Sequence, residues 1–539
     1  MTGRVRLESH VGIWRAQRRR AVSRAAFPLP DYRKSYLLLL LSALLFAGCA
    51  TVPKDYPRTE STAFQDYLDT SVGRLFEEAE QQHPGESGFA IIRFGRPAFT
   101  ARIALVDLAE KTLDAQYYIW EADSTGWILA ERLMRAADRG VRVRLLVDDI
   151  TLAGRDTRVA AMDAHPNIEI RVFNPFANRS ARLFDFLTDL GRVNHRMHNK
   201  VMVMDNAVAV VGGRNIGNHY FDVATDANFR DLDIAAAGPV VREVSNVFDY
   251  FWNGDWAVPI AALADRPYTE ADLRESRKAL QGLIAESPYP YPLDQDVAEL
   301  RSEFGSIRDT LIWAPGQIVW DDPAAIGQGI QEGALIKAFY NKVPTLQREL
   351  LMESAYFVPR DRAVEVSREM IARGVHLRLL TNSLASNDVV AAHAGYAKRR
   401  KLLIEAGVEV YEYRPDSMVS KTRAWRGESK AALHTKAIVF DRESVFIGSY
   451  NLDPRSADIN TEAGLYVESP ELAQQVIEYM DEGVRPENSY RVLLDEDGDL
   501  YWVTEVDGAE VRYYEEPLTT FGQRFMSGFI MILPVEQQL

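Results

Sequence analysis

The strongest constraint on the fold of this chain is an internal duplication. A stretch that begins at His198 reads HNKVMVMDNAVAVVGGRN, and a stretch that begins at His434 reads HTKAIVFDRESVFIGSYN. In both copies a lysine follows the histidine by two positions, an aspartate by seven and an asparagine by 17. A repeat with this spacing predicts that the chain contains two copies of one structural unit.

The correspondence continues upstream of both histidines. AQYYIW (115–120) matches SAYFVP (354–359), RGVRVRLLVDD (139–149) matches RGVHLRLLTNS (373–383), and IEIRVFNP (168–175) matches VEVYEYRP (408–415). The Arg-Gly pairs are typical of helix ends, and the apolar runs that follow them are typical of buried strands. The sequence therefore predicts an α/β fold that contains two similar lobes, each built around a sheet.

The histidine and the lysine of each copy lie two positions apart in an apolar run. Such positions in a strand point to the same side, so His198 faces the same way as Lys200, and His434 the same way as Lys436. A neutral imidazole beside an ammonium group suits a surface that meets an anion better than it suits a core. A single H-x-K is usually without function, but a repeated scaffold alone does not explain why both copies keep these polar residues.

The sequence divides into six segments. We expect a lipoprotein-type signal segment (1–48), a linker (49–85), a first lobe (86–250), a connector (251–330), a second lobe (331–485) and a C-terminal appendage (486–539). The connector is rich in Pro, Asp and Glu, and we expect it to be irregular. The appendage is expected to contain strands and a helix.

The only cysteine, Cys49, ends an apolar run. Arg33 and Lys34 precede this run, which extends from Tyr36 to Gly48 and is shorter than the roughly 20 residues of a membrane span. The pattern is typical of a secretory signal, and the ending LFAGC resembles the lipoprotein box, whose cysteine carries lipid. We expect Cys49 to anchor the protein in a bacterial cell envelope on the periplasmic side; an uncleaved anchor or a buried thiol is the alternative.

The charge distribution bears on which substrates are excluded. The chain carries −15 overall, but residues 1–48 hold nine Lys and Arg against two acidic residues. The remainder therefore holds 53 basic and 75 acidic residues, a net charge of −22. A body this acidic disfavours broad electrostatic binding of nucleic acid. We expect an anionic ligand to be held by a local group of residues instead.

Two H-x-K-x4-D-x6-G-[GS]-x-N motifs in one chain resemble the phospholipase D superfamily. The stretches MHNKVMVMDNAVAVVGGRNIG, NSLASNDVVAAHAGYAKRRKLL, FIGSYNLDPRS and ILPVE further resemble the bacterial cardiolipin synthase C type, over roughly residues 85 to 539. The resemblance implies two phospholipase D-like αβα lobes related by a pseudo-twofold, with one active site at their interface. The lipoprotein-like leader departs from the cytoplasmic-facing picture of this subgroup.

The resemblance also implies roles for the motif residues. One histidine attacks phosphorus and forms a phosphohistidine, and the other protonates the departing oxygen. The family gives the attack to the N-terminal copy, hence to His198 with His434 as the acid, although the pseudo-symmetry of the residues alone leaves the assignment open. Lys200 and Lys436 would bind the phosphoryl oxygens. No cofactor and no metal ion are implied, and the sequence contains no dedicated cluster of metal ligands.

Four residues at the end of the repeat are expected to support phosphate binding. Asn215 and Asn451 would supply hydrogen-bond donors, as they do in the family. The small residues Gly213 and Ser449 would leave room for backbone amides beside the phosphate.

Each histidine also needs an orienting carboxylate. Glu462, in INTEAGLYV, matches the glutamate of the family, and Asp231, in FRDLDIAAAG, takes the same place after the first copy; a surface aspartate is the alternative interpretation of Asp231. Asp205 and Asp441 belong to the catalytic motif. Strand alternation places Asp205 on the side opposite His198, so both aspartates are interpreted as supporting residues.

These residues and the resemblance indicate a phosphatidyltransferase that makes cardiolipin from phosphatidylglycerol and a second phospholipid, either phosphatidylethanolamine or phosphatidylglycerol. The alternatives are a hydrolase that releases phosphatidic acid, a phosphodiesterase that acts on nucleic acid, and a lipid-binding envelope protein with an inactive site. The protein is expected to associate with a membrane. The sequence does not identify a helper protein.

Three further features bear on lipid binding. Five aromatic residues are candidates for the mouth of the site, although they also suit the cores: Tyr117, Tyr118, Trp120, Tyr356 and Phe357. The run KRRK (398–401) would meet anionic headgroups or form a solvated helix face. Phenylalanines at i+4 spacing in FGQRFMSGFIMIL (521–533) predict a helix that lies on a membrane or packs on the core.

Overall fold

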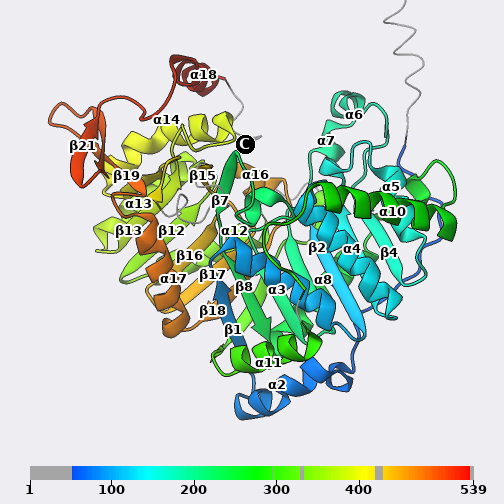
Figure 1. Cartoon of the computed structure of the whole chain (residues 1–539). Helices are drawn as coiled ribbons and strands as arrows, with labels where there is room; N and C mark the ends of the chain where they lie inside the picture. Colours follow the sequence, from blue (N-terminus) through cyan, green and yellow to red (C-terminus); the bar gives the residue numbers. More distant parts are fainter. Residues whose placement is uncertain (1–50, 295, 328–332, 419–428, 534–539) are drawn as a thin grey trace, which may run out of the picture. The chain divides into compact units, whose positions relative to one another are not determined.

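The computed structural model describes residues 51–294, 296–327, 333–418 and 429–533. The expected signal segment (1–48) and the lipidation residue Cys49 lie outside the described residues. The chain from Val52 onward forms one unit of contacts that contains both copies of the repeat. The two copies build two large mixed sheets with helices packed on them (Figure 1), so the expected two-lobe α/β fold is confirmed.

The first lobe is built around a nine-stranded sheet. In spatial order its strands are β10 (Ile312–Ala314), β1 (Ser87–Ile92), β8 (Asp233–Ala237), β6 (Val208–Gly212), β5 (Lys200–Met204), β2 (Thr112–Tyr117), β3 (Arg142–Asp148), β4 (Ile168–Phe173) and β9 (Ala257–Pro259). Strands β2, β3 and β4 run parallel because helices connect them. The strands β5, β6 and β8 continue the sheet as antiparallel neighbours.

The second lobe is built around a ten-stranded sheet. In spatial order its strands are β11 (Gly316–Trp320), β18 (Ala463–Glu468), β17 (Ser444–Gly448), β16 (Lys436–Phe440), β12 (Glu349–Ser354), β13 (His376–Asn382), β14 (Glu409–Tyr413), β19 (Ser489–Leu494), β20 (Leu500–Val506) and β21 (Ala509–Tyr513). The order β18-β17-β16-β12-β13-β14 repeats the order β8-β6-β5-β2-β3-β4 of the first sheet. The duplication in the sequence is thus a duplication of sheet topology.

Helices pack on both sheets. Those of the first lobe are α2 (Ser71–Gln82), α3 (Gly95–Leu108), α4 (Ser124–Asp138), α5 (Asp156–Asp163), α6 (Leu183–Thr188), α7 (Leu190–Val193), α8 (Pro239–Asn253) and α9 (Ile260–Leu263). Those of the second lobe are α12 (Ala334–Lys342), α13 (Asp361–Ala372), α14 (Val390–Ala406), α16 (Pro454–Asp458), α17 (Pro470–Gly483) and α18 (Phe521–Met531). Short 3-10 turns lie at Tyr67–Asp69, Asp149–Thr151, Asn218–Tyr220, Pro323–Gly327 and Val343–Thr345.

The two lobes share one apolar core. Residues of β5, β6 and β8 pack with residues of β16, β17 and β18, and α8 and α17 contribute to the same cluster. Val211 and Ile447, which occupy matching places on β6 and β17, are both almost fully buried there. Burial of this many apolar side chains is the main force that holds the lobes together. It also fixes the relative positions of β5 and β16, the strands that follow the two histidines.

A small third sheet joins the lobes directly. It pairs β7 (Ala227–Arg230) of the first lobe with β15 (Lys430–Leu433) of the second, in parallel and with Leu433 opposite Arg230. In Figure 1 this pair lies between the two large sheets. Both strands lead straight into residues that the sequence analysis singled out.

The connector is not irregular, contrary to expectation. Residues 251–330 contain α10 (Glu270–Glu286), α11 (Val297–Arg308), β10 and β11. Helix α10 begins at a capping box in which Thr269 and Asp272 exchange hydrogen bonds, and it packs on α4 and α5. β10 and β11 join the edges of the two large sheets. The polar composition of the connector therefore belongs to turns and to solvent-facing helix surfaces.

The C-terminal appendage extends the second lobe. Strands β19, β20 and β21 complete the second sheet, and α18 packs against α14. The phenylalanine face of α18 does not pack on the core, because Phe521, Phe525 and Phe529 are exposed. Among the described residues, no helix combines the length and the apolar character needed to cross a membrane.

The KRRK run is neither a solvated face nor a continuous basic patch. Arg399 and Arg400 are buried on α14. Arg399 pairs with Asp361, and Arg400 pairs with Glu412. These guanidinium groups tie α14 to neighbouring elements, since buried charges persist only when they are paired.

Candidate active site

His198 is positioned by contacts from the opposite lobe. It immediately precedes Asn199 and β5, and the preceding residue, Met197, forms a parallel bridge with Thr461 of the second lobe. The backbone N–H of His198 donates to the carbonyl of Thr461 at 2.9 Å. The next residue along the second lobe is Glu462, whose Oε2 lies 2.8 Å from Nδ1 of His198.

His434 is positioned in the same way with the lobes exchanged. It follows β15, whose last residue lies opposite Arg230 at the end of β7. The backbone N–H of His434 donates to the carbonyl of Arg230 at 2.8 Å. The next residue of the first lobe is Asp231, whose Oδ2 lies 2.6 Å from Nδ1 of His434. Asp231 is fully buried, so it is not a surface aspartate.

Each histidine is therefore oriented by the carboxylate of the other lobe. When the carboxylates are ionised they only accept hydrogen bonds, so Nδ1 of each ring then carries the proton and donates to Glu462 or Asp231. The unprotonated nitrogen is then Nε2 on both rings. This arrangement gives two imidazoles whose reactive nitrogens are set by contacts across one interface.

The two lysines of the motifs lie beside the histidines and are almost fully buried. Nζ of Lys436 donates to the carbonyl of His434 at 2.6 Å and lies 3.2 Å from Nε2 of the same ring. Nζ of Lys200 makes the matching bond to the carbonyl of His198. Burial lowers the pKa of both lysines, whereas the nearby carboxylates Glu462 and Asp231 favour their charged forms. Two buried ammonium groups beside the histidines suit a bound anion.

The histidines are buried and neutral. His198 is 8% exposed and His434 is 6% exposed. Burial, assisted by the adjacent lysines, lowers the pKa of His198 well below its ordinary value and lowers the pKa of His434 to about 4. Neutral imidazole is the form that can act as a nucleophile or a base.

The two carboxylates differ in electrostatic environment. Burial raises the pKa of Glu462 to about 7 despite Lys200 nearby. Burial acts in the same direction on Asp231, but the contact with His434 and the proximity of Lys436 outweigh it and lower the pKa of Asp231. The two carboxylates thus occupy matching places but have pKa values that are shifted in opposite directions.

The small residues after each repeat strand make room for the carboxylates. A Cβ atom at Gly213 would lie 2.1 Å from Oδ1 of Asp231, which no side chain could tolerate. At the matching position, the hydroxyl of Ser449 donates to Oε2 of Glu462 at 2.5 Å. Their backbone N–H groups donate to carbonyls of Leu232 and Ala463. These two amides are bonded within the sheets, so any amides beside the phosphate, for which the small residues are expected to leave room, belong to other residues.

The two asparagines are buried beside the site and act differently. Asn215 accepts a hydrogen bond from the backbone N–H of Ile119 and donates to the hydroxyl of Tyr220, so it joins the loop after β2 to the site. The side-chain oxygen of Asn451 is buried and has no hydrogen-bond partner among the described residues. A buried amide oxygen without a partner is costly, which is consistent with a contact to a bound hydroxyl group.

The motif aspartates do not lie near the histidines. Asp205 and Asp441 occupy tight turns with positive φ, of 53° and 54°, at the far ends of β5 and β16. The residue that follows each, Asn206 or Arg442, also has a positive φ, which is the pattern of a type I′ hairpin turn. Seven residues of extended chain separate each aspartate from its histidine, roughly 20 Å. Neither aspartate is placed to take part in catalysis.

Each motif aspartate instead binds the backbone that leads into a neighbouring strand. The carboxylate of Asp205 accepts the N–H groups of Glu110, Lys111 and Thr112 at 2.7–2.9 Å. The carboxylate of Asp441 binds residues 347–349 in the same manner. These bonds fix the register of β2 and β12 against the motif strands.

Replacing Asp205 by alanine is expected to destabilise the protein without removing activity. Three N–H groups would lose their acceptor, one of them buried and two partly buried, which costs on the order of 3 kcal/mol of unfolding free energy. Thermal denaturation should show the loss, and turnover per folded molecule should stay within about threefold of the parent. A loss of turnover as large as that of a histidine variant, in a protein that remains folded, would contradict the structural role.

Several aromatic rings enclose the histidines. The ring of Tyr118 lies 4.8 Å from His198, edge to face, so Tyr118 belongs to the site rather than to the core. Phe229 stacks on His434 at 5.3 Å, and Tyr220 meets the same ring edge-on at 5.1 Å.

The other predicted aromatic residues divide between core and rim. Tyr117 is buried in the first core, where its hydroxyl accepts a hydrogen bond from Arg102, and Phe357 packs in the second core. The hydroxyl of Tyr356 donates to Asp388 in the NSLASND loop at 2.8 Å. Alternation along a strand explains the difference between Tyr117 and Tyr118, since neighbours point to opposite faces.

The sequence analysis missed Tyr220, Phe229 and Ser456. The hydroxyl of Ser456 donates to Oε1 of Glu462 at 2.7 Å, so Glu462 receives two hydroxyl bonds besides its contact with His198. Ser456 lies in the FIGSYNLDPRS stretch, and the resemblance of that stretch to the family is the signal that could have identified it. Tyr220 and Phe229 lie in an insertion of the first copy that has no counterpart to signal them. Among the described residues, no group of three or more His, Cys, Asp or Glu side chains is placed to hold a metal ion.

Fold and site together define a pseudo-symmetric two-lobe enzyme in which each lobe supplies one histidine, one lysine and the carboxylate for the other histidine. Comparisons with known proteins agree with this class. The chain matches the family model described as cardiolipin synthase, PLD-like domain, over residues 103–252 and 345–483.

Two relatives and one solved structure are similar over most of the chain. Cardiolipin synthase C of Escherichia coli (strain K12) is 39% identical over 460 residues, which cover 84% of this chain and 97% of that protein. An uncharacterized protein of Helicobacter pylori (strain J99) is 29% identical over 499 residues, 92% of this chain and 98% of that protein. The crystal structure of phosphatidylserine synthase from Haemophilus influenzae Rd KW20 matches in fold with a TM-score of 0.54 and 15% identity, over 85% of this chain and 99% of that chain.

The chain therefore belongs to the phospholipase D superfamily. Within that superfamily it is a cardiolipin synthase-like enzyme, since both the family description and the E. coli relative point to that subgroup.

Proposed function

We propose that this enzyme transfers a phosphatidyl group to phosphatidylglycerol and so makes cardiolipin, with phosphatidylethanolamine or a second phosphatidylglycerol as the donor. The observation that carries the proposal is the pair of buried histidines, each held at Nδ1 by a carboxylate of the opposite lobe. Nε2 of both rings then carries no proton and is available for chemistry on one phosphodiester. The resemblance to a cardiolipin synthase over 84% of the chain supports a phospholipid as that phosphodiester.

In the first step, Nε2 of His198 attacks the donor phosphorus and a P–N bond forms. His434 takes up a second proton, at Nε2, as the anionic phosphodiester binds beside it; the P–O bond to the head-group alcohol then breaks, and His434 gives this proton to the departing oxygen. In the second step, a hydroxyl of the acceptor gives its proton to His434 and attacks phosphorus, and the P–N bond breaks. Lys200 and Lys436 offset the charge on the phosphoryl oxygens in both steps.

The unequal carboxylates support His198 as the nucleophile. A general acid must carry a proton as imidazolium before it donates, and an ionised carboxylate stabilises that cation. The pKa of Asp231 is lowered, so Asp231 stays ionised beside His434. Burial raises the pKa of Glu462, so Glu462 stabilises a cation at His198 less well and leaves that ring neutral.

The near-closed site also favours transfer over hydrolysis. Water competes with the acceptor hydroxyl for the phosphohistidine, so a synthase must keep water scarce at phosphorus. All six central side chains, His198 and His434 with their lysines and carboxylates, are less than one-tenth exposed. Tyr118, Tyr220 and Phe229 cover the rings.

Product analysis tests the proposal. The purified enzyme, given phosphatidylglycerol and phosphatidylethanolamine in mixed micelles, should form cardiolipin as its main product. Micelles of phosphatidylglycerol alone would tell the two donors apart. Phosphatidic acid as the dominant product at high acceptor concentration would make the protein a hydrolase instead, with the two-histidine chemistry intact.

We also propose that two exposed apolar segments hold the enzyme on a membrane. One, on α6 and α7 of the first lobe, comprises Leu183, Phe184, Phe186, Leu187 and Leu190. The other, on and beside α18 of the second lobe, comprises Leu518, Phe521, Phe525, Met526, Phe529 and Ile532. Figure 1 places α6, α7 and α18 along the upper edge of the view. Exposed apolar patches of this kind suit a lipid surface.

Replacing Phe521 and Phe525 together by glutamate is expected to weaken binding to phospholipid vesicles by about tenfold or more, since two large apolar side chains would no longer enter the lipid. Sedimentation with vesicles measures the loss, in a background in which Cys49 is replaced by serine so that attached lipid does not mask it. Turnover of a short-chain, water-soluble substrate should not change. Ile307→Glu on α11, an exposed apolar residue outside both segments, is the control; equal binding by all three proteins would refute the proposal.

The expected envelope location is likewise a proposal. If Cys49 is lipidated, mass spectrometry of the mature protein from a bacterial host should find Cys49 as the first residue, with a diacylglyceryl group attached. Replacing Cys49 by serine should abolish the attachment of lipid. If residues 1–48 are still present on the mature chain, anchoring through a lipidated Cys49 is ruled out.

A further inference from the structure

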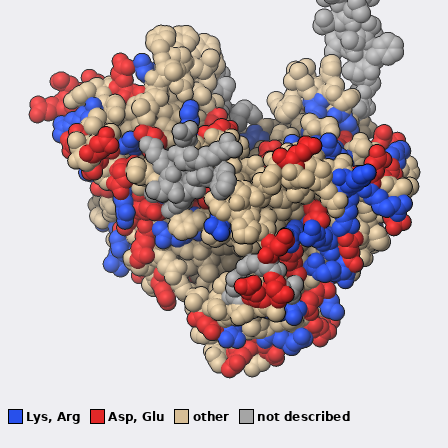
Figure 2. Space-filling model, in the orientation of Figure 1, with Lys and Arg blue, Asp and Glu red and all other residues tan. Residues whose placement is uncertain are grey.

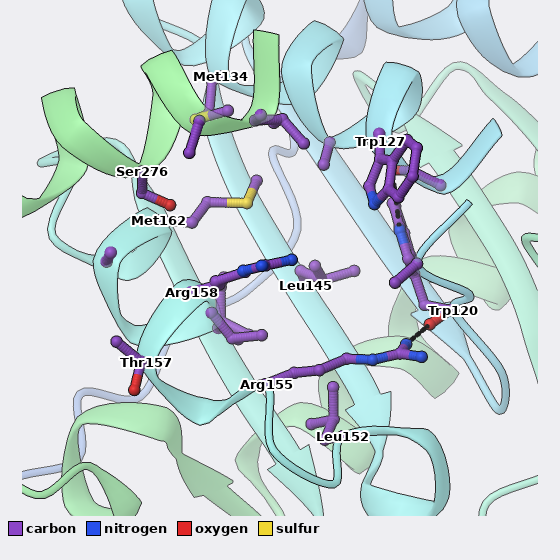
Figure 3. A pocket seen from close by; sticks show the side chains of 18 of the residues that line it. Trp120, Trp127, Met134, Leu145, Leu152, Arg155, Thr157, Arg158, Met162 and Ser276 are labelled. Carbon is purple, nitrogen blue, oxygen red and sulfur yellow. Dashed lines mark hydrogen bonds between the residues drawn. The ribbon is translucent and has the colours of Figure 1, made fainter. Parts of the chain in front are cut away.

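The first lobe contains an apolar cavity of about 370 Å³ beneath α10, here called the lobe-one cavity (Figure 3). Helix α4 and strand β3 line one side, and α5 and α10 line the other. Figure 3 shows five of the side chains that form its walls: Trp120, Trp127, Met134, Leu145 and Met162. The volume lies within the range of about 300–1,000 Å³ that is typical of ligand sites.

The cavity exists because the two lobes differ in one helix. Between its second and third parallel strands the second lobe has α14, a helix of 17 residues that packs against α13. The first lobe has α5 at the same place, with only eight residues. Helix α10 of the connector covers the remaining space by packing on α4 and α5, but it does not fill the space. An unfilled apolar volume weakens a core, and a bound apolar chain would offset that loss.

The lobe-one cavity adjoins the active site through one loop. Trp120, which lines the cavity, lies two residues after Tyr118, whose ring faces His198 at 4.8 Å. Trp120 also forms a backbone bridge with Ile216, next to Asn215. Residues 118–122 therefore join a residue that contacts His198 to a residue of the cavity wall.

Two arginines of α5 and the turn before it line the same cavity. Figure 3 shows the side chains of Arg155 and Arg158 extending alongside each other across it. Arg155 donates to the carbonyl of Trp120 at 2.8 Å and lies 3.6 Å from Glu121, a long and exposed ion pair. The side chain of Arg158 has no hydrogen bond or ion pair with any residue that the structure describes. Arg266 and Asp272, also on the rim, are paired with each other.

Apolar walls beside two guanidinium groups match a phospholipid, with a chain in the cavity and a phosphate at the arginines. Cardiolipin contains two phosphodiesters, and only one of them is made or broken in the proposed reaction. Lys200 and Lys436 serve that reacting group. The phosphodiester of the acceptor stays intact and needs cations of its own, close to the site.

We propose that the lobe-one cavity is the acceptor subsite: an acyl chain of the acceptor phosphatidylglycerol lies in the cavity, and its phosphodiester lies at Arg155 and Arg158. This assignment rests on the proposed phosphatidyl transfer. It gives the two arginines a role in choosing between a lipid acceptor and water. It leaves the attack on the donor to the histidines and lysines.

The test is the ratio of cardiolipin to phosphatidic acid formed from phosphatidylethanolamine and phosphatidylglycerol in mixed micelles. Arg158→Gln should lower this ratio about tenfold and raise the KM for phosphatidylglycerol by a similar factor, because a charged hydrogen bond to the acceptor is lost. Total consumption of donor should remain near that of the parent, with water replacing the acceptor. Arg158→Lys should restore part of the ratio.

A second variant tests the apolar part of the subsite. Ser276→Trp on α10 would place an indole ring in the cavity, and it should lower the ratio with long-chain phosphatidylglycerol while leaving dihexanoyl phosphatidylglycerol unaffected. Gln281→Trp and Arg274→Gln, on the same helix but not lining the cavity, are the matched controls for bulk and for charge. An unchanged ratio in both Arg158→Gln and Ser276→Trp would overturn the proposal.

A binding measurement separates this proposal from the proposed function. Fluorescence of phosphatidylglycerol that carries a parinaroyl chain, excited directly, reports binding without turnover. Binding that Ser276→Trp and Arg158→Gln weaken at least fivefold supports the subsite even if the protein proves to be a hydrolase. Equal binding of parinaroyl phosphatidylethanolamine, with equal sensitivity to Arg158→Gln, would assign the cavity to the donor and refute the acceptor assignment.

Discussion

His198→Ala and His434→Ala should each reduce cardiolipin formation by about four orders of magnitude or more. Neither step of the proposed reaction proceeds without His198, which forms the P–N bond and then loses it. Neither proceeds well without His434, which gives a proton to the departing oxygen in the first step and takes one from the acceptor hydroxyl in the second. Both side chains lie at the lobe interface, each held at Nδ1 by a carboxylate of the other lobe. Initial rates with labelled phosphatidylglycerol measure the loss. Near-normal rates in both single variants would show that the site lies elsewhere.

The two variants should differ in what they accumulate. His434→Ala keeps the nucleophile, so a donor with a good leaving group should form an acid-labile phosphoenzyme at His198. His198→Ala should form none. The reverse pattern would exchange the two roles. His195→Ala is the control, because His195 is a half-buried histidine nearby whose ring contacts the carbonyl of Ile459 rather than a carboxylate; it should keep normal turnover.

Glu462→Gln should reduce turnover by two to four orders of magnitude, and Asp231→Asn should do the same, on the order seen when a catalytic histidine loses its carboxylate. An amide can donate to Nδ1 as well as accept from it, so the ring can turn to the tautomer that places the proton on Nε2. Because each carboxylate belongs to the lobe opposite its histidine, both losses would show that catalysis depends on contacts between the lobes. Ser456→Ala, which removes one hydroxyl from Glu462, should have a much smaller effect.

The same Glu462→Gln variant should also change how stability depends on pH. The pKa of Glu462 in the folded protein is about 7, above the 4.5 of an exposed glutamate, chiefly because of burial. Between these values the folded protein holds a proton that the unfolded chain has released. The contribution of Glu462 to stability is therefore fully present below about pH 4.5 and is lost as the pH rises through about 7.

Glutamine has no such dependence. The unfolding free energy of the variant, relative to the parent, should therefore rise between about pH 5 and about pH 8 by on the order of 3 kcal/mol. Chemical denaturation at both pH values measures the difference. A constant difference would mean that Glu462 is already ionised at low pH in the folded protein.

The sequence predicted the repeated lobes and the residues at the site because both follow from local pattern. Strand alternation placed His198 beside Lys200 and away from Asp205, and the structure agrees. The match of INTEAGLYV and FRDLDIAAAG identified Glu462 and Asp231 as the carboxylates.

Pairing across the lobes could not be read from the sequence. Each carboxylate contacts the histidine of the other lobe because of two backbone pairings, Met197–Thr461 and Leu433–Arg230. These pairings join residues more than 200 positions apart. Tyr117 and Tyr118 show the same limit on a smaller scale, since a run of aromatic residues does not say which of them faces the core. The connector was misjudged because Pro, Asp and Glu are compatible with exposed amphipathic helices such as α10.

The crossed hydrogen bonds bear on how such an enzyme arises. A protein with one lobe would hold its histidine without a carboxylate, and two identical copies would complete each other about a twofold axis, as subunits do in an isologous dimer. Joining the copies in one chain removes the concentration dependence of that assembly and frees each half to change alone. The unequal surroundings of Glu462 and Asp231, and a helix shortened in one half only, are changes that an identical pair of subunits could not have made.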